Sequence, residues 1–130
     1  MPVFHMLPDE ARQIADYFST VFLDDSLDQY DARFTAAEAR RGEELYGQLG
    51  CRACHQLGTA GGYVGPELSS TGGRLKPGWI AAWLSAPRKY KPDTLQPDYG
   101  LSGADVRALT AYLSGLGRAG GAATRDRSAP

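Results

Sequence analysis

The sequence predicts an all-α protein built from short helices and loops. Apolar residues recur at three- and four-residue spacing in several stretches, as they do on one face of a helix. Two capping patterns, Thr35 with Glu38 and, in a weaker form, Ser102 with Asp105, mark helix starts. The 16 glycines and 8 prolines suit short helices joined by loops, and no stretch has a strand pattern.

The first predicted helix begins at Pro8 and runs to about residue 22. Pro8 suits a first helical turn, and Asp9 and Glu10 follow at the positive end of the helix dipole. Its apolar face is marked by Ala11, Ile14, Ala15, Phe18 and Phe22. Residues 23–34 contain four aspartates and are predicted to form an acidic linker.

The second predicted helix begins after Thr35, runs through Leu49 and is stopped by Gly50. Residues 56–75, rich in Gly, Thr and Ser, are a predicted loop. A third helix begins at Pro77 and ends before Pro87.

Residues 87–101 form a second predicted loop, and the last helix begins after Ser102. Its predicted buried stripe consists of Val106, Leu109, Leu113 and Leu116, with Thr110 beside it. Residues 118–130, rich in Gly, Ala and Arg, are a predicted disordered tail.

Five residues, Cys51-Arg52-Ala53-Cys54-His55, carry the chemistry that the sequence indicates. The spacing C-x-x-C-H is the attachment signal for a c-type haem. Two thiols form thioether bonds to the porphyrin, and the imidazole binds the iron from one face. Positions i, i+3 and i+4 of a helical turn share a face, so one turn can present all three groups.

Other uses of the cysteine pair fit less well. A zinc site needs more ligands, but the chain has no third cysteine and its only other histidine is the distant His5. A thioredoxin-like pair needs a βαβ setting. A disulfide between Cys51 and Cys54 would leave His55 without a role.

Length and charge limit the remaining classes. The 130 residues suit one domain, and a formal net charge of −1 gives no global reason to expect nucleic-acid binding. No apolar run is long enough to span a bilayer, and no secretory signal is present.

An internal repeat relates residues 1–18 to residues 96–113. Without gaps, the aligned pairs are Pro2 with Pro97, Phe4 with Tyr99, Met6 with Leu101, Glu10 with Asp105, Arg12 with Arg107, Ile14 with Leu109 and Tyr17 with Tyr112. A proline-led turn and an amphipathic helix therefore occur twice. The copies differ at their first residue, which is Met1 in one and Gln96 in the other.

Further stretches support the haem motif in a fixed order along residues 35–117. They are the capped helix before Cys51, Gly65-Pro66-Glu67-Leu68, the Trp79 to Leu84 helix with Pro87, Leu95-Gln96-Pro97-Asp98-Tyr99, and Ala111-Tyr112-Leu113. In this order the chain resembles the class I c-type cytochromes in their small bacterial form. The resemblance implies the cytochrome c fold, with short helices and loops wrapped around one covalent haem c, and here an extra N-terminal helix.

The resemblance also implies roles for particular residues. The first and last helices of the domain would cross through Gly42, Tyr46, Leu109 and Tyr112. The Pro66 carbonyl would hold the second ring nitrogen of His55, which fixes its tautomer and basicity.

The resemblance further implies a change at the second iron ligand, because Gln96 stands where the family usually has Met. Met with His raises the reduction potential, whereas an amide oxygen is harder and favours Fe(III). Either Gln96 binds the iron or it lines the pocket, with water or no ligand in its place. Met1 and Met6, from this chain or a swapped neighbour, are the other candidates for the sixth ligand.

Several residues near the motif have two interpretations. Trp79, Trp83 and Tyr63 are expected to pack in the pocket or core, and Trp79 can also donate a hydrogen bond to a haem propionate. Arg74 is either a solvated loop charge or a propionate partner. Met6 is expected to pack, and His5 to lie on the surface. Tyr99, Lys89 and Lys91 are further candidates for an iron ligand.

The expected function is electron transfer by a non-enzymatic carrier or by a subunit of a redox complex, including a membrane complex. The alternative is a haem with an open distal site that binds a small gas or reduces peroxide. Haem attachment in the resembled family takes place outside the cytoplasm, so an exported, periplasmic location is expected. The chain is then a processed form, a fragment or one domain of a larger protein.

Partners are expected to be redox proteins. Residues 1–34 carry seven acidic and two basic side chains, whereas residues 74–91 carry five basic side chains and no acid. Such a basic rim can steer an acidic redox partner. The N-terminal repeat resembles the end of a preceding cytochrome domain, which predicts a tandem, di-haem protein with domain boundaries at 1–22, 23–34, 35–117 and 118–130.

Overall fold

The computed structural model describes residues 4–21, 27 and 29–117. Within these residues the chain is helical and contains no β-strand. The elements are α1 (Pro8–Val21), α2 (Ala36–Gln48), the 3-10 turn η2 (Cys51–Ala53), α3 (Thr71–Arg74), α4 (Pro77–Ser85), α5 (Pro87–Tyr90) and α6 (Gly103–Gly115). The predictions for Met1, for Phe22, for most of the linker before residue 29 and for the tail 118–130 lie outside the described residues.

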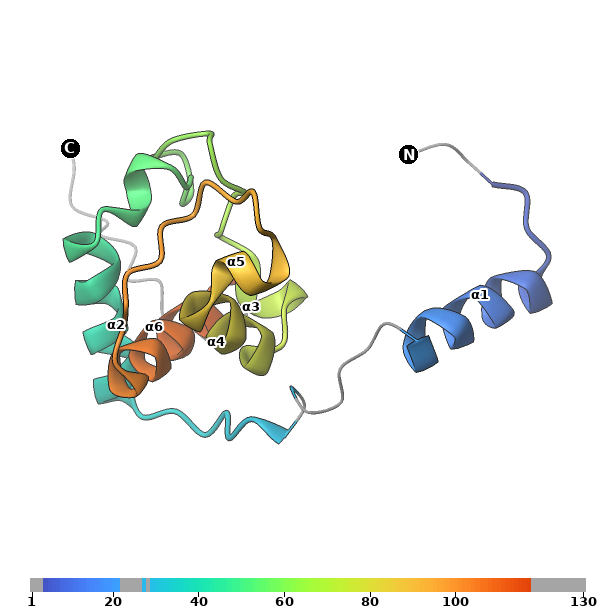
Figure 1. The fold of residues 1–130 in the computed structure, drawn as a ribbon, viewed down its shortest axis with the longest axis horizontal. Coiled ribbons are helices and arrows are strands. Elements are labelled where there is room, and N and C mark those ends of the chain that lie inside the picture. Colours follow the sequence, from blue (N-terminus) through green and yellow to red (C-terminus); the bar gives the residue numbers. More distant parts are fainter. Residues whose placement is uncertain (1–3, 22–26, 28, 118–130) are drawn as a thin grey trace, which may run out of the picture.

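Helices α2 and α6 lie side by side and form the main contact of the fold (Figure 1). Helices α3 and α4 both pack on α6, and the loops between the helices close over one side of this group. Helix α1 stands apart from it in Figure 1 and is joined to it by the linker. The extra N-terminal helix is thus a separate element and not part of the core.

The start of α2 follows directly from its capping box. The backbone N–H of Glu38 donates to Thr35 Oγ1 at 3.1 Å, and the backbone N–H of Thr35 donates to Glu38 Oε2 at 2.7 Å. Both bonds satisfy N–H groups that the first helical turn leaves open. At the other end Gly50 adopts φ of 69°, a left-handed conformation that glycine tolerates best, and turns the chain towards Cys51.

The crossing of α2 and α6 depends on a glycine. A Cβ atom at Gly42 would lie 2.0 Å from the Ala108 carbonyl oxygen, so only glycine lets the two backbones approach this closely. Next to the crossing, the rings of Tyr46 and Tyr112 pack with centroids 5.5 Å apart. The core around this crossing consists of Leu45, Tyr46, Ile80, Ala108, Leu109 and Leu113. The predicted crossing through Gly42, Tyr46, Leu109 and Tyr112 is confirmed.

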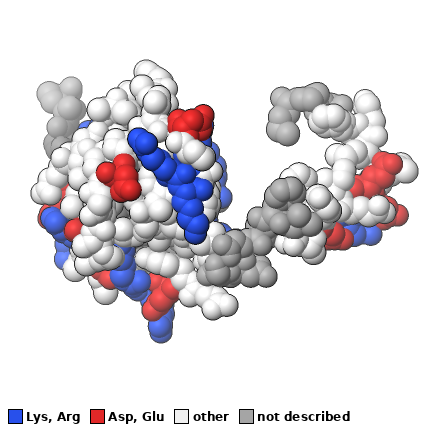
Figure 2. Space-filling view, viewed as in Figure 1, with Lys and Arg blue, Asp and Glu red and all other residues white. Residues whose placement is uncertain are grey.

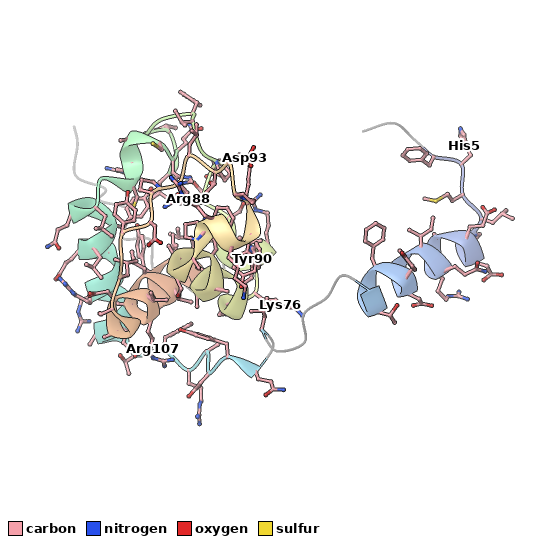
Figure 3. All side chains as sticks on the ribbon, viewed as in Figure 1. His5, Lys76, Arg88, Tyr90, Asp93 and Arg107 are labelled. Atoms are coloured by element: carbon pink, nitrogen blue, oxygen red, sulfur yellow. The ribbon has the colours of Figure 1, made fainter. Side chains whose placement is uncertain are left out.

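Arg107 ties the end of the linker to α6. Its guanidinium donates to Glu38 Oε1 at 2.6 Å and to the carbonyl oxygens of Asp31 and Arg33, each at 2.7 Å. It also lies 5.1 Å from the centre of the Phe34 ring. Hydrogen bonds from Thr35 and then from Arg107 lower the pKa of Glu38, so this carboxylate stays charged. Figure 3 shows Arg107 at the end of α6 nearest the linker.

The helix bounds agree closely with those predicted from the sequence, but the predictions for both long loops were wrong in part. The predicted loop 56–75 contains the single helical turn α3, and the predicted loop 87–101 begins with α5. Pro87 begins α5 because its fixed φ suits a first helical turn. Both turns are too short to show a hydrophobic period.

Two packing predictions were also wrong. Tyr63 is 82% exposed and Met6 is 46% exposed, so neither packs in the core. Tyr63 lies in a surface loop, and Met6 precedes α1, which stands apart from the core. His5 is exposed as predicted and lies on the same segment (Figure 3).

The substitution Gly42→Ala should destabilise the protein, because the new Cβ would collide with the α6 backbone. Overpacking of this kind lowers the free energy of unfolding by about 1–3 kcal/mol. Because rigid backbone lies on both sides of this site, we expect a loss at the upper end of that range. Urea unfolding followed by circular dichroism measures the change. Gly47→Ala, in the same helix with nothing within 4 Å of its Cβ, is the control and should be neutral or slightly stabilising. Equal stabilities for the two variants would contradict the role of Gly42.

Candidate functional site

A cavity of about 660 Å³ opens between α2, η2, α4, α6 and the two long loops. Its size lies within the range of roughly 300–1,000 Å³ that is usual for ligand and cofactor sites. Its walls are mostly apolar and are built by Leu49, Leu68, Ile80, Trp83, Leu84, Leu109 and Leu113, among others. The cavity is therefore suited to a large apolar molecule that carries a few polar groups.

The motif residues line one end of this cavity. The chain turns tightly after Gly50, and the backbone N–H groups of Cys54 and His55 both donate to the Cys51 carbonyl, at 3.3 and 2.9 Å. This single turn presents Cys51, Cys54 and His55 to the same space. Both thiols are free and half-buried. Burial raises the pKa of the Cys51 thiol.

The imidazole of His55 is held by the loop segment at Gly65 and Pro66. Its Nδ1 lies 2.8 Å from the Pro66 carbonyl oxygen, which can only accept, so we assign the proton to Nδ1. A neutral ring then carries its lone pair on Nε2, the atom that faces the cavity. A Cβ atom at Gly65 would lie 2.4 Å from His55 Cε1, so the backbone also packs flat against the ring.

Gln96 contacts His55 inside the cavity. Its Oε1 lies 3.2 Å from His55 Nε2, and its backbone N–H donates to Thr94 Oγ1 at 3.1 Å. With the proton on Nδ1, both facing atoms are acceptors, and such a pair repels unless a cation lies with them or the amide turns round to donate. In the absence of an iron, a turned amide donates an N–H to His55 Nε2; with an iron present, both Nε2 and the amide oxygen can act as ligands.

Two hydroxyl groups in the same cavity lack a hydrogen-bond partner. Tyr46 is 4% exposed and Thr71 is 2% exposed, and both of their hydroxyl oxygens are buried. Burying a hydroxyl without a partner costs about 1–3 kcal/mol. Both residues line the cavity, so a bound molecule with polar groups can satisfy them.

These features fit a covalently bound haem. The thiols would form the two thioether bonds, the apolar walls suit the macrocycle, and His55 would bind the iron, with Gln96 as the neighbouring candidate for a second ligand. The two buried hydroxyls can meet polar groups of the same molecule. Within the described ranges, no cluster of three or more His, Cys, Asp or Glu side chains could hold a metal ion without such a cofactor.

Comparison with known proteins agrees with this geometry. The family model described as Cytochrome c matches residues 39–117, which is more than half of the chain. The chain belongs to the cytochrome c family. A search of the curated proteins found no match. Members of this family carry covalent haem c and are typically electron carriers.

Membership agrees with the helical fold and with the position of the haem motif after α2. In the part of the chain that the structure describes, we find no helix with the length and apolar character needed to cross a bilayer.

The predicted site residues divide into two groups. Cys51, Cys54, His55, Pro66, Trp79 and Gln96 all line the cavity. Arg74 does not line it; its guanidinium donates to the Glu67 carbonyl oxygen at 2.9 Å, and the side chain is exposed. A contact between Arg74 and the haem stays a prediction.

Sequence reasoning missed the polar roles of Tyr46 and Thr71. Tyr46 was expected to face inward as part of the core, and its ring does so. No local pattern indicates that its hydroxyl, or that of Thr71, would be left without a partner. Met6 lies on α1's side of the molecule and does not line the cavity, and Met1 lies outside the described residues.

Gly65→Ala should disturb the iron ligand without disturbing the fold. The added methyl group would push the imidazole away from the Pro66 carbonyl, which weakens the contact that fixes its tautomer; loss of such contacts typically costs 10–100-fold in metal affinity or activity. The visible absorbance spectrum of the oxidised protein should shift, and the reduction potential should change. Gly103→Ala, with nothing near its Cβ, is the control. A Gly65→Ala protein with the wild-type spectrum and potential would refute this role.

Proposed function

We propose that residues 35–117 form a one-electron carrier domain with one haem c, bound through Cys51 and Cys54 and ligated by His55 and Gln96. The observation that carries this proposal is that both thiols, His55 and Gln96 line one cavity. Gln96 Oε1 lies 3.2 Å from His55 Nε2, and this contact would open when an iron binds between the two side chains. When bound, the haem supplies a reversible one-electron couple. A pair of protein ligands leaves no coordination site for a substrate.

The chain's own residues hold both ligands in place. The Pro66 carbonyl fixes the ring of His55 and makes Nε2 the free nitrogen. The loop that carries Gln96 is tied to the end of α2 by a hydrogen bond from Tyr99 Oη to the Leu49 carbonyl at 3.2 Å. The exposed Lys91–Asp93 ion pair at 2.7 Å lies within this loop. Fixed ligands favour electron transfer, because the site then changes little between oxidation states.

Gln96 in place of Met as the second ligand is expected to lower the reduction potential. A thioether is a soft ligand that stabilises Fe(II), whereas an amide oxygen is hard and stabilises Fe(III). The proposed His–Gln pair therefore gives a lower potential than a His–Met pair in the same pocket. Such a carrier donates electrons more readily than a His–Met relative does.

The competing function is a haem whose distal ligand gives way to a small gas or to peroxide. The hard amide oxygen favours it, because such a ligand binds Fe(II) weakly. Against it stands the position of Gln96, whose side chain is half-buried and already occupies the space opposite His55.

We also propose an exported location and an acidic redox partner. Attachment of haem c takes place outside the cytoplasm in the family, and this supports export. Helix α5 carries Arg88 and Lys89 on the exposed side of the domain, close to the loop that lines the cavity. Figure 2 shows one diagonal band of Lys and Arg side chains on the front of the domain, with acidic side chains on either side of it. Asp93 pairs with Lys91, so the net positive charge of the face comes mainly from α5.

Cyanide added to the oxidised protein tests the proposed function, because the hard amide oxygen is the stronger ligand for Fe(III). If Gln96 holds the sixth position, binding should be slow and limited by release of the amide, whereas Gln96→Ala should bind at least ten times faster. Stopped-flow absorbance measures both rates. Equal, fast binding by the two proteins would mean an open distal site and would favour the competing function.

Gln96→Met should raise the reduction potential. The new thioether would stand opposite His55 and stabilise Fe(II), and axial ligands span roughly 0.8 V among haem proteins. A redox titration followed by absorbance measures the shift. Thr94→Val, which alters the same loop without changing the ligand, should move the potential far less. An unchanged potential in Gln96→Met would remove Gln96 from the iron.

Electron transfer to an anionic oxidant such as ferricyanide should slow as salt is added, because ions screen the attraction to the basic face. Lys89→Glu should lower the rate at low salt and flatten its salt dependence. Arg40→Glu makes the same charge change at an exposed position of α2, a helix separate from α5, and serves as the control. A rate that does not respond to salt would exclude steering by this face.

A further inference from the structure

Helices α1 and α6 correspond position by position. Adding 95 to a residue number in α1 gives its partner in the internal repeat, so Pro8 matches Gly103, and both residues begin their helices. The lengths also agree, because Pro8–Val21 has 14 residues and Gly103–Gly115 has 13. The repeat seen in the sequence is therefore also a repeat of structure.

The starts of the two helices are capped in related ways. The backbone N–H of Leu7 donates to Glu10 Oε2 at 2.9 Å, and Asp105, the partner of Glu10, accepts from Ser102 Oγ at 2.9 Å. In each copy an acidic residue three positions on bonds the residue before the helix. This agreement goes beyond the apolar pattern shared by the two helices.

The two copies differ in burial. Ile14 is 46% exposed, whereas its partner Leu109 is 2% exposed. Met6 is 46% exposed, and its partner Leu101 packs against the core. The exposed side chains line a groove along α1, formed by Met6, Glu10, Gln13, Ile14, Tyr17 and Phe18.

The partner residues of this groove show what such a surface binds. On α6, Ala108 and Tyr112 meet Gly42 of α2, and Leu109 and Leu113 line the cavity. The same face thus packs on the helix before a C-x-x-C-H motif and closes the pocket beside it. In this chain α2 is already covered by α6, so α1 needs another helix of the same kind.

The linker holds α1 near the haem domain. A Cβ atom at Gly78, at the start of α4, would lie 1.9 Å from the Leu27 carbonyl oxygen and 3.1 Å from Tyr30 Cβ, so the linker packs directly on α4. Arg107 fixes the linker again at Asp31 and Arg33. From Val21 to Leu27 the chain can reach at most about 20 Å, given about 3.3–3.6 Å per residue. Whatever binds α1 is kept close to the α4 side of this domain.

We propose that α1 is the last helix of a second c-type haem domain. Its apolar face packs on the helix that precedes a second C-x-x-C-H motif, as α6 packs on α2, and closes a second haem pocket. The occupant of the groove is therefore the haem-bearing part of another cytochrome domain. The linker then sets two redox centres side by side. This inference goes beyond the electron transfer proposed above and does not depend on the sixth ligand.

The test begins with the protein isolated undenatured from the cells that make it. Haem absorbance, divided by the amount of residues 35–117 found by quantitative mass spectrometry, should give two haems for each copy. A denaturing gel stained for haem then shows whether the second haem lies on the same polypeptide or on a separate subunit, and either result supports the proposal.

Two variants made in the native gene test the surface itself. Ile14→Asp places a charge in the groove. When unfolding in urea is followed by haem absorbance, about half of the absorbance change should then occur at a lower urea concentration. Thr20→Asp adds the same charge to α1 at a position whose partner, Gly115, is exposed, and should shift neither half.

One haem per copy would overturn the proposal, including the case in which two copies of this chain pair through α1. So would an Ile14→Asp protein in which both haems, or neither, are destabilised. Failure of the electron-transfer proposal would leave these haem counts and transitions unchanged, so the two failures can be told apart.

Discussion

The close approach of α2 and α6 at Gly42 is the contact on which the rest of the structure depends. It allows backbone to pack on backbone, because a Cβ atom at Gly42 would lie only 2.0 Å from the Ala108 carbonyl oxygen. Beside this crossing, Tyr46, Leu109 and Leu113 line the cavity. One end of the resulting space is closed by the motif turn, so the position of the cofactor follows from the position of one glycine.

Within that space His55 is held more firmly than Gln96. His55 is held by a carbonyl and by the flat packing of Gly65, so its position is set before any iron is bound. Gln96 comes from a loop, and its amide can turn either its oxygen or its NH₂ group towards His55. The same residue can therefore face a bare imidazole as a donor and an iron as an acceptor. A methionine could not do this, because a thioether has no hydrogen to donate.

The repeat of α6 in α1 gives the chain a second, exposed copy of its own pocket wall. An apolar helix face of this kind is unfavourable in water and calls for a partner. The linker limits where α1 can lie, because Gly78 and Arg107 hold the end of the linker on the surface of the domain. Packing at Gly78 and the hydrogen bonds of Arg107 thus fix the described end of the linker on the domain.

The sequence by itself determined the features that depend on neighbours along the chain. Capping at Thr35 and Ser102, the stops at Gly50 and Pro87, the repeat, and the C-x-x-C-H spacing are all local, and the helix bounds follow from them. Tertiary structure alone decided the direct contact between Gln96 and His55, and the hydrogen bond from Arg74 to the Glu67 carbonyl outside the cavity. It also decided that Tyr63 is exposed and that the hydroxyls of Tyr46 and Thr71 are buried without partners. Those outcomes depend on how the two long loops close over the α2–α6 crossing, and such contacts join residues too far apart in sequence for any local pattern to record them.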